Sequence, residues 1–401
     1  MCMRAIYSVK LRYLIATLLL LLITACEKNR QDSTARVVTT AAELGELMFH
    51  DASLSASGKQ SCASCHSPEH AHAQPNVLSV QMGGVSLNQP GTRAVPSLRY
   101  LNKTPPFSID NQGTPSGGFN HDGSAETLAA QVERPLLAAN EMANGTRAHV
   151  IQKIRQANYA DAFKKIYGEQ SLENVDIAFA NLGDALQQYQ LEDNEFFPFD
   201  SKYDFYLAGK VELSPAEMRG LTLFNDKQRA NCAACHPSAR NADGSAPLFT
   251  DFTYDALGLP RNQTIAANSD KVHFDLGLCS SGREGKASKV SECGKFKVPT
   301  LRNVATRKVF FHNGQVKSLR EAVAFYSRRD THPHEWYPTV DGKVQKFNDL
   351  PKIHHKNINS DEAPYDRKPG QKPVLSEQEI DDVVAFLHTL TDGYREPQKT
   401  K

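Results

Sequence analysis

The sequence contains one five-residue pattern twice: CASCH at residues 62–66 and CAACH at residues 232–236. C-x-x-C-H is the attachment pattern of c-type haem, in which two thiols form thioether bonds to the porphyrin and the next histidine binds the iron. A zinc site would need four ligands, and a thioredoxin-like redox pair would not need the histidine. The sequence therefore predicts two covalently bound haem c groups, attached and ligated by Cys62, Cys65, His66, Cys232, Cys235 and His236.

The N-terminal residues indicate export. Three basic residues precede an apolar stretch at residues 13–25, which is too short to span a bilayer as a stable helix. Residues 23–26 match a lipobox, so we expect residues 1–25 to be a lipoprotein signal peptide and Cys26 to carry the lipid. An ordinary signal peptide followed by an incidental cysteine is the alternative. Both readings place the mature protein in the periplasm, and in the first its only membrane contact is the lipid anchor.

Charge and cysteine content agree with an exported chain. The predicted signal removes three of the 46 basic residues and none of the 45 acidic ones, so the mature chain is nearly neutral. This balance argues against nucleic acid, and against a broad anionic membrane surface, as a partner. Once the lipid and haem cysteines are assigned, Cys279 and Cys293 remain. In an oxidising compartment we expect them to form a disulfide.

The two halves of the chain resemble each other around the haem motifs. Capping boxes that begin at Thr40 and Ser214 each open a helix ahead of a motif. Beyond the motifs, VPSLR at residues 95–99 matches VPTLR at residues 298–302, and further matched positions follow at constant spacing. The sequence therefore predicts a mainly α fold of two tandem cytochrome c-type haem domains that arose by internal duplication.

The domain boundaries follow from this repeat. We expect residues 26–39 to be a polar tether, residues 40–203 to form the domain of haem 1, and residues 204–395 to form the domain of haem 2. The second domain includes a long polar stretch at residues 327–375, which we expect to pack over haem 2. A last capping box at Ser376 predicts the final helix.

The repeat also allows the sixth coordination position of the two irons to be compared. Tyr326 lies on the apolar face of a helix that begins after Ser318, and it is the expected second ligand of the haem 2 iron. The matching residue of the first half is Pro135, which cannot bind iron and should end or kink its helix. The haem 1 iron is therefore expected to be five-coordinate. The alternative is that Tyr326 is a core aromatic residue and that His332 or His334 binds the second iron.

Together these features resemble the bacterial dihaem cytochrome c peroxidases and the related MauG enzymes. The resemblance rests on both haem motifs, on FNHDG at residues 119–123, on NEM at residues 140–142 and on FKVPTLRN at residues 296–303. It covers most of residues 40–330 and the final helix. It implies two α-helical cytochrome c domains that face each other. Peroxide would react at haem 1, and haem 2 would act as the partner oxidant or as the site at which electrons enter.

Within this family the residue at position 326 separates two activities. Peroxidases that receive electrons from small cytochromes have a methionine there, whereas MauG has a tyrosine. An anionic oxygen ligand should lower the haem potential and favour higher iron oxidation states. The resemblance therefore implies a periplasmic oxidase that reacts with hydrogen peroxide at haem 1 and shares the oxidising equivalents with haem 2. Its partner would be a small cytochrome, a cupredoxin or another protein substrate. The alternatives are a cytochrome c peroxidase that detoxifies peroxide and a non-catalytic dihaem electron carrier.

The resemblance also assigns residues to the open side of haem 1. Glu141, six residues after Pro135, matches the distal glutamate of the family, and a carboxylate there can move a proton between the two peroxide oxygens. Gln131 matches a distal glutamine. His121 stands where the family normally has a tryptophan between the haems, and both an electron relay and a purely structural role are open for it.

The calcium site of the family and two histidines after the first haem motif need separate mention. The interhaem calcium is doubtful, since its asparagine falls on Ala94 and its carbonyl-supplying stretch has become residues 307–309. His70 and His72 follow the first haem motif closely. We expect them to be solvated loop histidines, with a capping role on haem 1 as the alternative.

Overall fold

The computed structural model describes residues 37–280, 282 and 289–396. The predicted signal peptide (residues 1–25) and Cys26 lie outside the described residues. The chain divides into two units at Thr39 and Thr40, and the account below concerns the second. No helix in the described part of the chain is both long enough and apolar enough to cross a membrane.

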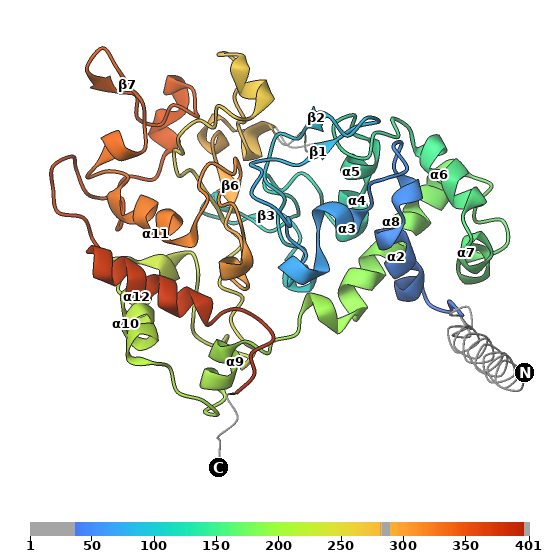
Figure 1. The fold of residues 1–401 in the computed structure, drawn as a ribbon, viewed down its shortest axis with the longest axis horizontal. Coiled ribbons are helices and arrows are strands. Elements are labelled where there is room, and N and C mark those ends of the chain that lie inside the picture. The colour runs from blue at the N-terminus through green and yellow to red at the C-terminus, as the bar shows by residue number, and fades with distance from the viewer. Residues whose placement is uncertain (1–36, 281, 283–288, 397–401) are drawn as a thin grey trace, which may run out of the picture. The chain divides into compact units, whose positions relative to one another are not determined.

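In the first half, the helices α2 (Ala41–His50) and α8 (Val175–Glu192) pack against each other (Figure 1). α2 begins at the predicted capping box, in which the Thr40 hydroxyl accepts a bond from the Glu43 N–H and the Glu43 carboxylate accepts one from the Thr40 N–H. Gly45 allows the close contact between the helices. A Cβ at this position would lie 2.0 Å from the carbonyl oxygen of Ala185.

Shorter elements connect these two helices and carry the first haem motif. They are α3 (Cys62–Cys65), α4 (Leu128–Gln131), α5 (Glu133–Leu137), α6 (Arg147–Gln156), α7 (Ala160–Tyr167) and the paired strands β1 (Met82–Gly83) with β2 (Gln89–Pro90) and β3 (Ser108–Ile109) with β4 (Pro115–Ser116). The strands are too short to form a layer. The first half is therefore built on helices, with tight antiparallel turns between them.

The second half repeats this packing with α10 (Pro215–Asn225) and α12 (Glu377–His388). Both begin at the predicted capping boxes, at Ser214 and Ser376. A Cβ at Gly220 would lie 2.0 Å from the carbonyl oxygen of Asp382. The other α-helices and the paired strands of this half are α9 (Lys202–Leu207), α11 (Leu319–Arg328), β5 (Tyr254–Asp255) with β6 (Phe296–Lys297) and β7 (Thr339–Val340) with β8 (Lys343–Val344), and short 3₁₀ segments lie between them.

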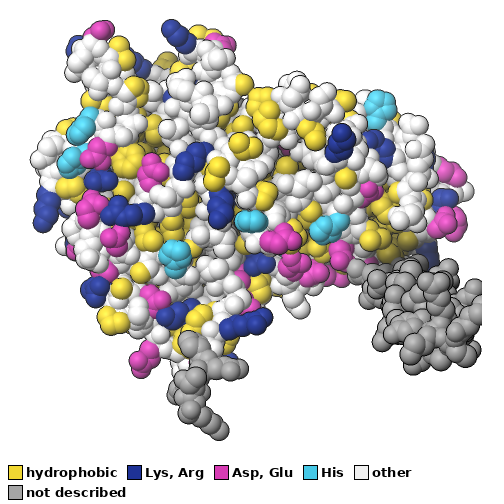
Figure 2. Space-filling model, in the orientation of Figure 1, with side chains coloured by type: hydrophobic (Ala, Val, Ile, Leu, Met, Phe, Trp, Pro, Cys, Tyr) yellow, Lys and Arg dark blue, Asp and Glu magenta, His cyan; other side chains and the backbone are white. Residues whose placement is uncertain are grey.

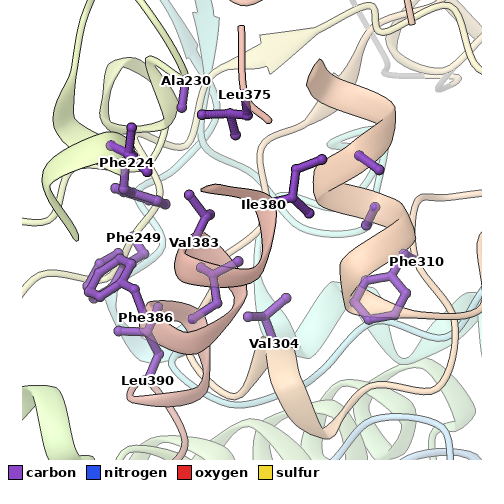
Figure 3. Close-up of a cluster of buried hydrophobic side chains, with 14 of the residues drawn as sticks. Phe224, Ala230, Phe249, Val304, Phe310, Leu375, Ile380, Val383, Phe386 and Leu390 are labelled. Atoms are coloured by element: carbon purple, nitrogen blue, oxygen red, sulfur yellow. The ribbon is translucent and has the colours of Figure 1, made fainter. Parts of the chain in front are cut away.

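A core of apolar side chains lies between α10, α12 and the loops that carry the second haem motif. Phe224 from α10 and Val383 and Phe386 from α12 meet Phe249 there, and all four are at most 1% exposed (Figure 3). The rings of Phe224 and Phe386 lie 5.1 Å apart, edge to face, a favourable arrangement for aromatic pairs. This core fixes the second haem motif relative to the helices behind it.

The two halves are joined by a pair of equivalent backbone hydrogen bonds. The Ala94 N–H donates to the carbonyl oxygen of His312 at 2.7 Å, and the Lys297 N–H donates to that of His121 at 2.8 Å. Ala94 and Lys297 each directly precede the matched Val-Pro sequences, and His121 and His312 also occupy matched positions. In each half, the residue before the Val-Pro sequence therefore donates a hydrogen bond to the other half, and the matched histidine accepts one from it.

The prediction of a mainly α fold is confirmed, since the only sheets in the described part of the chain are two-stranded. The predicted disulfide between Cys279 and Cys293 is also present. The break near Pro135 differs in detail. The helical segment is interrupted at Val132, and Pro135 lies inside α5. A proline fits there because the first turn of a helix does not need its N–H groups.

The stretch at residues 327–375 is less irregular than its sequence suggested. It contains β7 and β8 and two 3₁₀ segments, Pro333–Glu335 and Lys352–Asn357. Arg329 ties the start of this stretch to the second half, because its guanidinium donates to the carbonyl oxygens of Leu257 and Asn359 at 2.9 and 2.6 Å. The stretch is thus held by hydrogen bonds from a side chain that is fully buried.

Candidate functional site

The second C-x-x-C-H motif opens onto a cavity of about 320 Å³. Cys232, Cys235 and His236 line it, and neither cysteine takes part in a disulfide. The Nδ1 atom of His236 lies 2.7 Å from the carbonyl oxygen of Phe249. A carbonyl can only accept, so Nδ1 carries the proton and Nε2 is left for a metal. Burial lowers the pKa of His236 to about 4, which keeps the imidazole in the neutral form that binds metals.

Tyr326 extends from α11 to the same cavity. Its ring centroid lies 5.9 Å from that of Phe311 and 6.0 Å from that of Tyr365. Its hydroxyl forms no hydrogen bond to any residue that the structure describes, and burial raises its pKa above the ordinary value. His332 and His334, the alternative ligands, are not among the residues that line this cavity.

The residues around this cavity suit a covalently bound haem. They supply two thiols that are free of disulfides, an imidazole with one nitrogen held by the backbone, and a phenol that has no hydrogen-bond partner among the described residues. Burial raises the pKa of both Cys232 and Cys235 to about 12, with neighbouring acidic groups adding to the shift for Cys235.

The first motif shows the same arrangement around its histidine. Cys62 and Cys65 lie on α3, and the Nδ1 atom of His66 lies 3.1 Å from the carbonyl oxygen of Pro96 and 3.2 Å from that of His72. Burial lowers the pKa of His66 to about 4 and raises that of Cys62 to about 12. The backbone therefore orients each predicted iron ligand through its Nδ1–H.

The cavity continues from the second motif toward the first half of the chain. Pro96, His121 and Gln131 line this part of it, together with residues of the second half. Glu141 and Pro135 do not line the cavity. The cavity thus reaches both halves of the chain, and Gln131 and His121 line it from the first half, whereas Glu141 lies outside it.

Glu141 lies in the turn that follows α5. Its Oε1 atom is 3.7 Å from Arg134 Nε. Burial raises the pKa of Glu141, and Arg134 partly offsets this. Burial also raises the pKa of Cys65, and the charge of Glu141 adds to that shift, which places the carboxylate on the side of the first motif. A carboxylate whose pKa is raised holds a proton more readily than an ordinary carboxylate, as a group that accepts and returns a proton must.

Two features support the turn that carries Glu141. The Pro135 carbonyl accepts a bond from the Met142 N–H at 2.9 Å, so the proline contributes its backbone oxygen to this turn. Gly83 packs against the other side of this turn, and a Cβ at Gly83 would lie 2.3 Å from the carbonyl oxygen of Asn140. Sequence reasoning missed Gly83. The Gly-Gly pair at residues 83–84 was the available signal, because such pairs mark tight turns.

His121 is held at the junction of the two halves. Its Nε2 atom lies 2.9 Å from the carbonyl oxygen of Ala94, and burial, together with the charge of Arg93, lowers its pKa to about 4. His312, at the matched position, stacks on Phe296 with a centroid distance of 3.5 Å and an angle of 11° between the rings. Two neutral imidazoles therefore stand at the junction. No group of three His, Cys, Asp or Glu residues in the described chain is placed to hold a metal ion.

The expectation that His72 is a solvated loop residue was wrong. His72 is fully buried, and its ring lies 4.1 Å from that of Phe196 and 5.9 Å from that of Phe49. The reason is a left-handed backbone at Ala71 and His72, with φ of 55° and 53°, which turns the ring inward. His70 stays partly exposed, and its Nδ1 lies 3.1 Å from Ser67 Oγ.

The stretch at residues 327–375 contributes to the second site. Residues 362–365 line the cavity. Trp336 packs edge-on against Phe325 of α11 at 5.3 Å, and the Tyr337 hydroxyl donates to the carbonyl oxygen of Gly258 at 2.6 Å. Part of this stretch therefore forms a wall of the cavity, beside the ring of Tyr326.

Comparisons with known proteins agree with this site. The family model described as di-haem cytochrome c peroxidase matches residues 39–212. The methylamine utilization protein MauG of Paracoccus denitrificans is 34% identical over 371 residues, which cover 89% of both chains. The crystal structure of the diheme peroxidase BthA from Burkholderia thailandensis matches with a TM-score of 0.83 and 37% identity, over 90% of this chain and 89% of that one. A cytochrome c551 peroxidase of Pseudomonas aeruginosa is 29% identical over 70% of each chain. This chain therefore belongs to the dihaem cytochrome c peroxidase and MauG family, and it is an enzyme of the dihaem peroxidase class that takes two haem c groups.

Proposed function

We propose that this enzyme is a MauG-like oxidase that uses hydrogen peroxide at the first haem site and withdraws electrons from a redox protein partner by way of the second. The observation that carries the proposal is Tyr326. Its phenol shares the cavity with Cys232, Cys235 and His236 and has no other polar partner among the described residues. The matched position of the first half is Pro135, which offers no ligand. The two sites would therefore differ in function, with the first open and the second closed.

When bound, the haems supply the iron that reacts with peroxide and that stores oxidising equivalents. The chain's own residues orient and close the sites. His66 and His236 would hold the irons in positions set by backbone carbonyls. Tyr326 would occupy the remaining position of the second iron. Glu141 would take a proton from one peroxide oxygen and deliver it to the other.

Gln131 and His121 have supporting roles in this proposal. The Gln131 side chain faces the cavity at the end of α4 and would help to orient peroxide or water on the open side of haem 1. His121 is anchored to the Ala94 carbonyl oxygen at 2.9 Å. This contact would hold its ring in one place between the two haems, whether or not electrons pass through it.

We also propose that the two halves arose by internal duplication. Gly45 and Gly220 hold matched positions, and each lets a helix approach the backbone of its partner to the same distance. The hydrogen bonds of Ala94 and Lys297 across the junction follow the same correspondence. The proposed domains are residues 40–203 and 204–395, each with one motif.

The proposed location is the periplasm. After removal of residues 1–25, a lipid at Cys26 would anchor the protein to the membrane, and residues 26–39 would form the tether. The disulfide between Cys279 and Cys293 supports an oxidising compartment. On the face shown in Figure 2, basic and acidic side chains are interspersed, which agrees with a nearly neutral protein and with partners recognised locally. A small cytochrome, a cupredoxin or another protein substrate would be such a partner.

Replacing Tyr326 by phenylalanine tests the proposal. In the ferric wild type, electron paramagnetic resonance should show one high-spin and one low-spin haem. Tyr326→Phe should turn the low-spin signal into a second high-spin one, because the ligand oxygen is lost. Tyr326→Met should keep it low-spin with a higher potential, since thioether ligands raise haem potentials. Tyr365→Phe is the matched control, because it removes a hydroxyl from the same cavity and should leave both signals unchanged. A low-spin haem 2 in Tyr326→Phe would make Tyr326 a core aromatic residue.

A second candidate function is peroxide detoxification with electrons from a small cytochrome, as the name of the cytochrome c551 peroxidase relative implies for that protein. The two functions differ in how the enzyme is re-reduced. Rapid steady-state turnover of peroxide with a reduced small cytochrome would favour detoxification. Slow turnover with that donor, combined with a long-lived oxidised state, would favour the MauG-like oxidase.

A further inference from the structure

Arg307 is a charged residue without a charged partner at the junction of the two halves. It follows the 3₁₀ segment Val304–Thr306, and its guanidinium lines the cavity. Its hydrogen bonds go to backbone oxygens only: Nη2 donates to Val95 at 3.2 Å and Nε donates to Val309 at 3.3 Å. No described carboxylate lies within ion-pair distance of it. Each of these bonds uses one N–H group, so other N–H groups of the guanidinium remain free for a ligand.

Other buried arginines near the cavity differ in this respect. Arg93 binds Asp275 and Asp122, each at 2.6 Å, and Arg302 binds Asp204 at 2.8 Å. For Arg307, burial is the sole cause that shifts the pKa, and it lowers the pKa to about 10. Removing a charge from water without a counter-ion is unfavourable. The described part of the chain provides no anion for Arg307, so an anion from outside the chain would complete the site.

The position of Arg307 indicates which side of the molecule this anion would come from. Val95, whose carbonyl oxygen Arg307 binds, directly precedes Pro96, and the Pro96 carbonyl oxygen orients His66. Burial lowers the pKa of both His66 and His121, and the charge of Arg307 contributes to each shift. A residue of the second half thus reaches the backbone that supports the iron ligand of the first.

We propose that Arg307 binds a propionate carboxylate of haem 1, so that the second half of the chain anchors the cofactor of the first half and raises its potential. The inference rests on the proposed haem-binding function. A guanidinium suits this task, because its planar fork matches a carboxylate and stays charged even when buried. The same chemistry would accept a small carboxylate or halide from solvent, and the test below separates the two sources.

The test measures the two haem potentials of the intact dihaem protein by spectroelectrochemistry, in wild type, Arg307→Gln, Arg307→Lys and Lys308→Gln. Loss of a nearby positive charge stabilises the ferric form. Arg307→Gln should shift one haem about tenfold toward ferric, a fall of about 59 mV for a one-electron couple. Arg307→Lys keeps the charge and should shift it less than threefold. Lys308→Gln removes an exposed neighbouring charge and should change neither potential.

The outcomes distinguish this inference from the proposed function. A haem stain that reports fewer than two haems in the wild type would contradict the function itself. Two haems in the wild type, with equal potentials in Arg307→Gln and Lys308→Gln, would overturn the propionate contact alone. Formate or chloride added to the wild type identifies a solvent anion: if the salt changes the potential, and Arg307→Gln abolishes that change, the propionate assignment is wrong. If Arg307→Gln does not fold, a shift of tenfold or more in Arg307→Lys would also count against the charge-based account.

Discussion

At the scale of single residues, the two haem motifs were predictable because their function lies in a contiguous sequence. His66 and His236 needed only their spacing from two cysteines. Their Nδ1 partners, the carbonyl oxygens of Pro96 and Phe249, were not predictable, because backbone oxygens leave no trace in residue identity. The burial of His72 depends on a left-handed turn that two ordinary residues adopt, and its sequence gave no sign of it.

We predict that Glu141→Gln leaves both haems attached and both ferric spectra nearly unchanged, because it removes a proton carrier and not an iron ligand. Peroxide turnover should fall by about 10²- to 10⁴-fold, the usual contribution of a general acid or base. In the wild type, the raised pKa of Glu141 should move the acid limb of the pH–activity profile above the range of an ordinary carboxyl. Glu133→Gln, in the first turn of α5, is the control and should keep full activity. Comparable rates in both variants would contradict the role of Glu141.

Asp349, which lines the cavity, allows a test of electrostatics that is read from protein stability and not from turnover. Burial raises its pKa to about 7, although it accepts a bond from Asn313 at 2.9 Å and lies 3.6 Å from Arg261. The folded protein therefore binds this proton more tightly than the unfolded chain, so stability from this group is full below about pH 4 and decreases as the pH rises to 7.

Asp349→Asn removes this pH-dependent loss. One pKa unit corresponds to 1.36 kcal/mol, so the variant should gain about 1–4 kcal/mol over the wild type between pH 4 and pH 8. Urea unfolding at both pH values measures the difference. Asp341→Asn, an exposed residue in the turn between β7 and β8, should show no such dependence. An equal effect of Asp349→Asn at both pH values would show that the carboxyl ionises normally.

At the scale of elements, helix starts were the best-predicted features. The boxes at Thr40, Ser214 and Ser376 form as expected, because a capping box involves residues only three positions apart. At Ser318 only half of it forms: the Ser318 hydroxyl accepts from the Glu321 N–H, but the Glu321 carboxylate accepts from the Lys317 N–H. The order within residues 327–375 was not predictable, since its short elements depend on distant contacts.

Helix packing gives a prediction that compares the two halves. Gly45→Ala and Gly220→Ala should each lower the free energy of unfolding by about 3 kcal/mol or more, because the new methyl group meets backbone oxygens that cannot move aside. Thr222→Ala, on the exposed face of α10, should change it by less than about 0.5 kcal/mol. Denaturant titration of the three variants tests this. A small effect at only one glycine would show that the two helix pairs are not equivalent.

At the scale of the whole molecule, the repeat predicted two matched halves, and the chain's relatives establish the enzyme class. The repeat could not show which contacts tie the halves together, because these contacts depend on how the two halves are placed against each other. Asp392 is an example. Its carboxylate accepts bonds from Arg99 at 2.9 Å and Tyr100 at 2.6 Å in the first half and from Asn303 at 2.5 Å in the second.

Removing this carboxylate should destabilise the molecule as a whole. The side chain of Asp392 is 3% exposed and that of Arg99 is 15% exposed, so Asp392→Ala leaves Arg99 with a largely buried, uncompensated charge and should cost about 3 kcal/mol. Calorimetry of the holoprotein should show a lower midpoint. The control is Asp381→Ala, which breaks the exposed ion pair with Arg320 and should cost less than about 1 kcal/mol. If both variants unfold at the same temperature, Asp392 does not tie the halves together.

The two reciprocal hydrogen bonds across the junction involve only main-chain atoms of Ala94, His121, Lys297 and His312. Side chains at these positions can therefore change during evolution while the joint between the halves persists. If the side chain at position 121 lies between the two haems, as proposed, a single mutation could replace it without moving the backbone that joins the halves. For a protein engineer, position 121 is then a place at which different aromatic side chains can be substituted. A change in electron-transfer rate after such a substitution can be attributed to the ring itself.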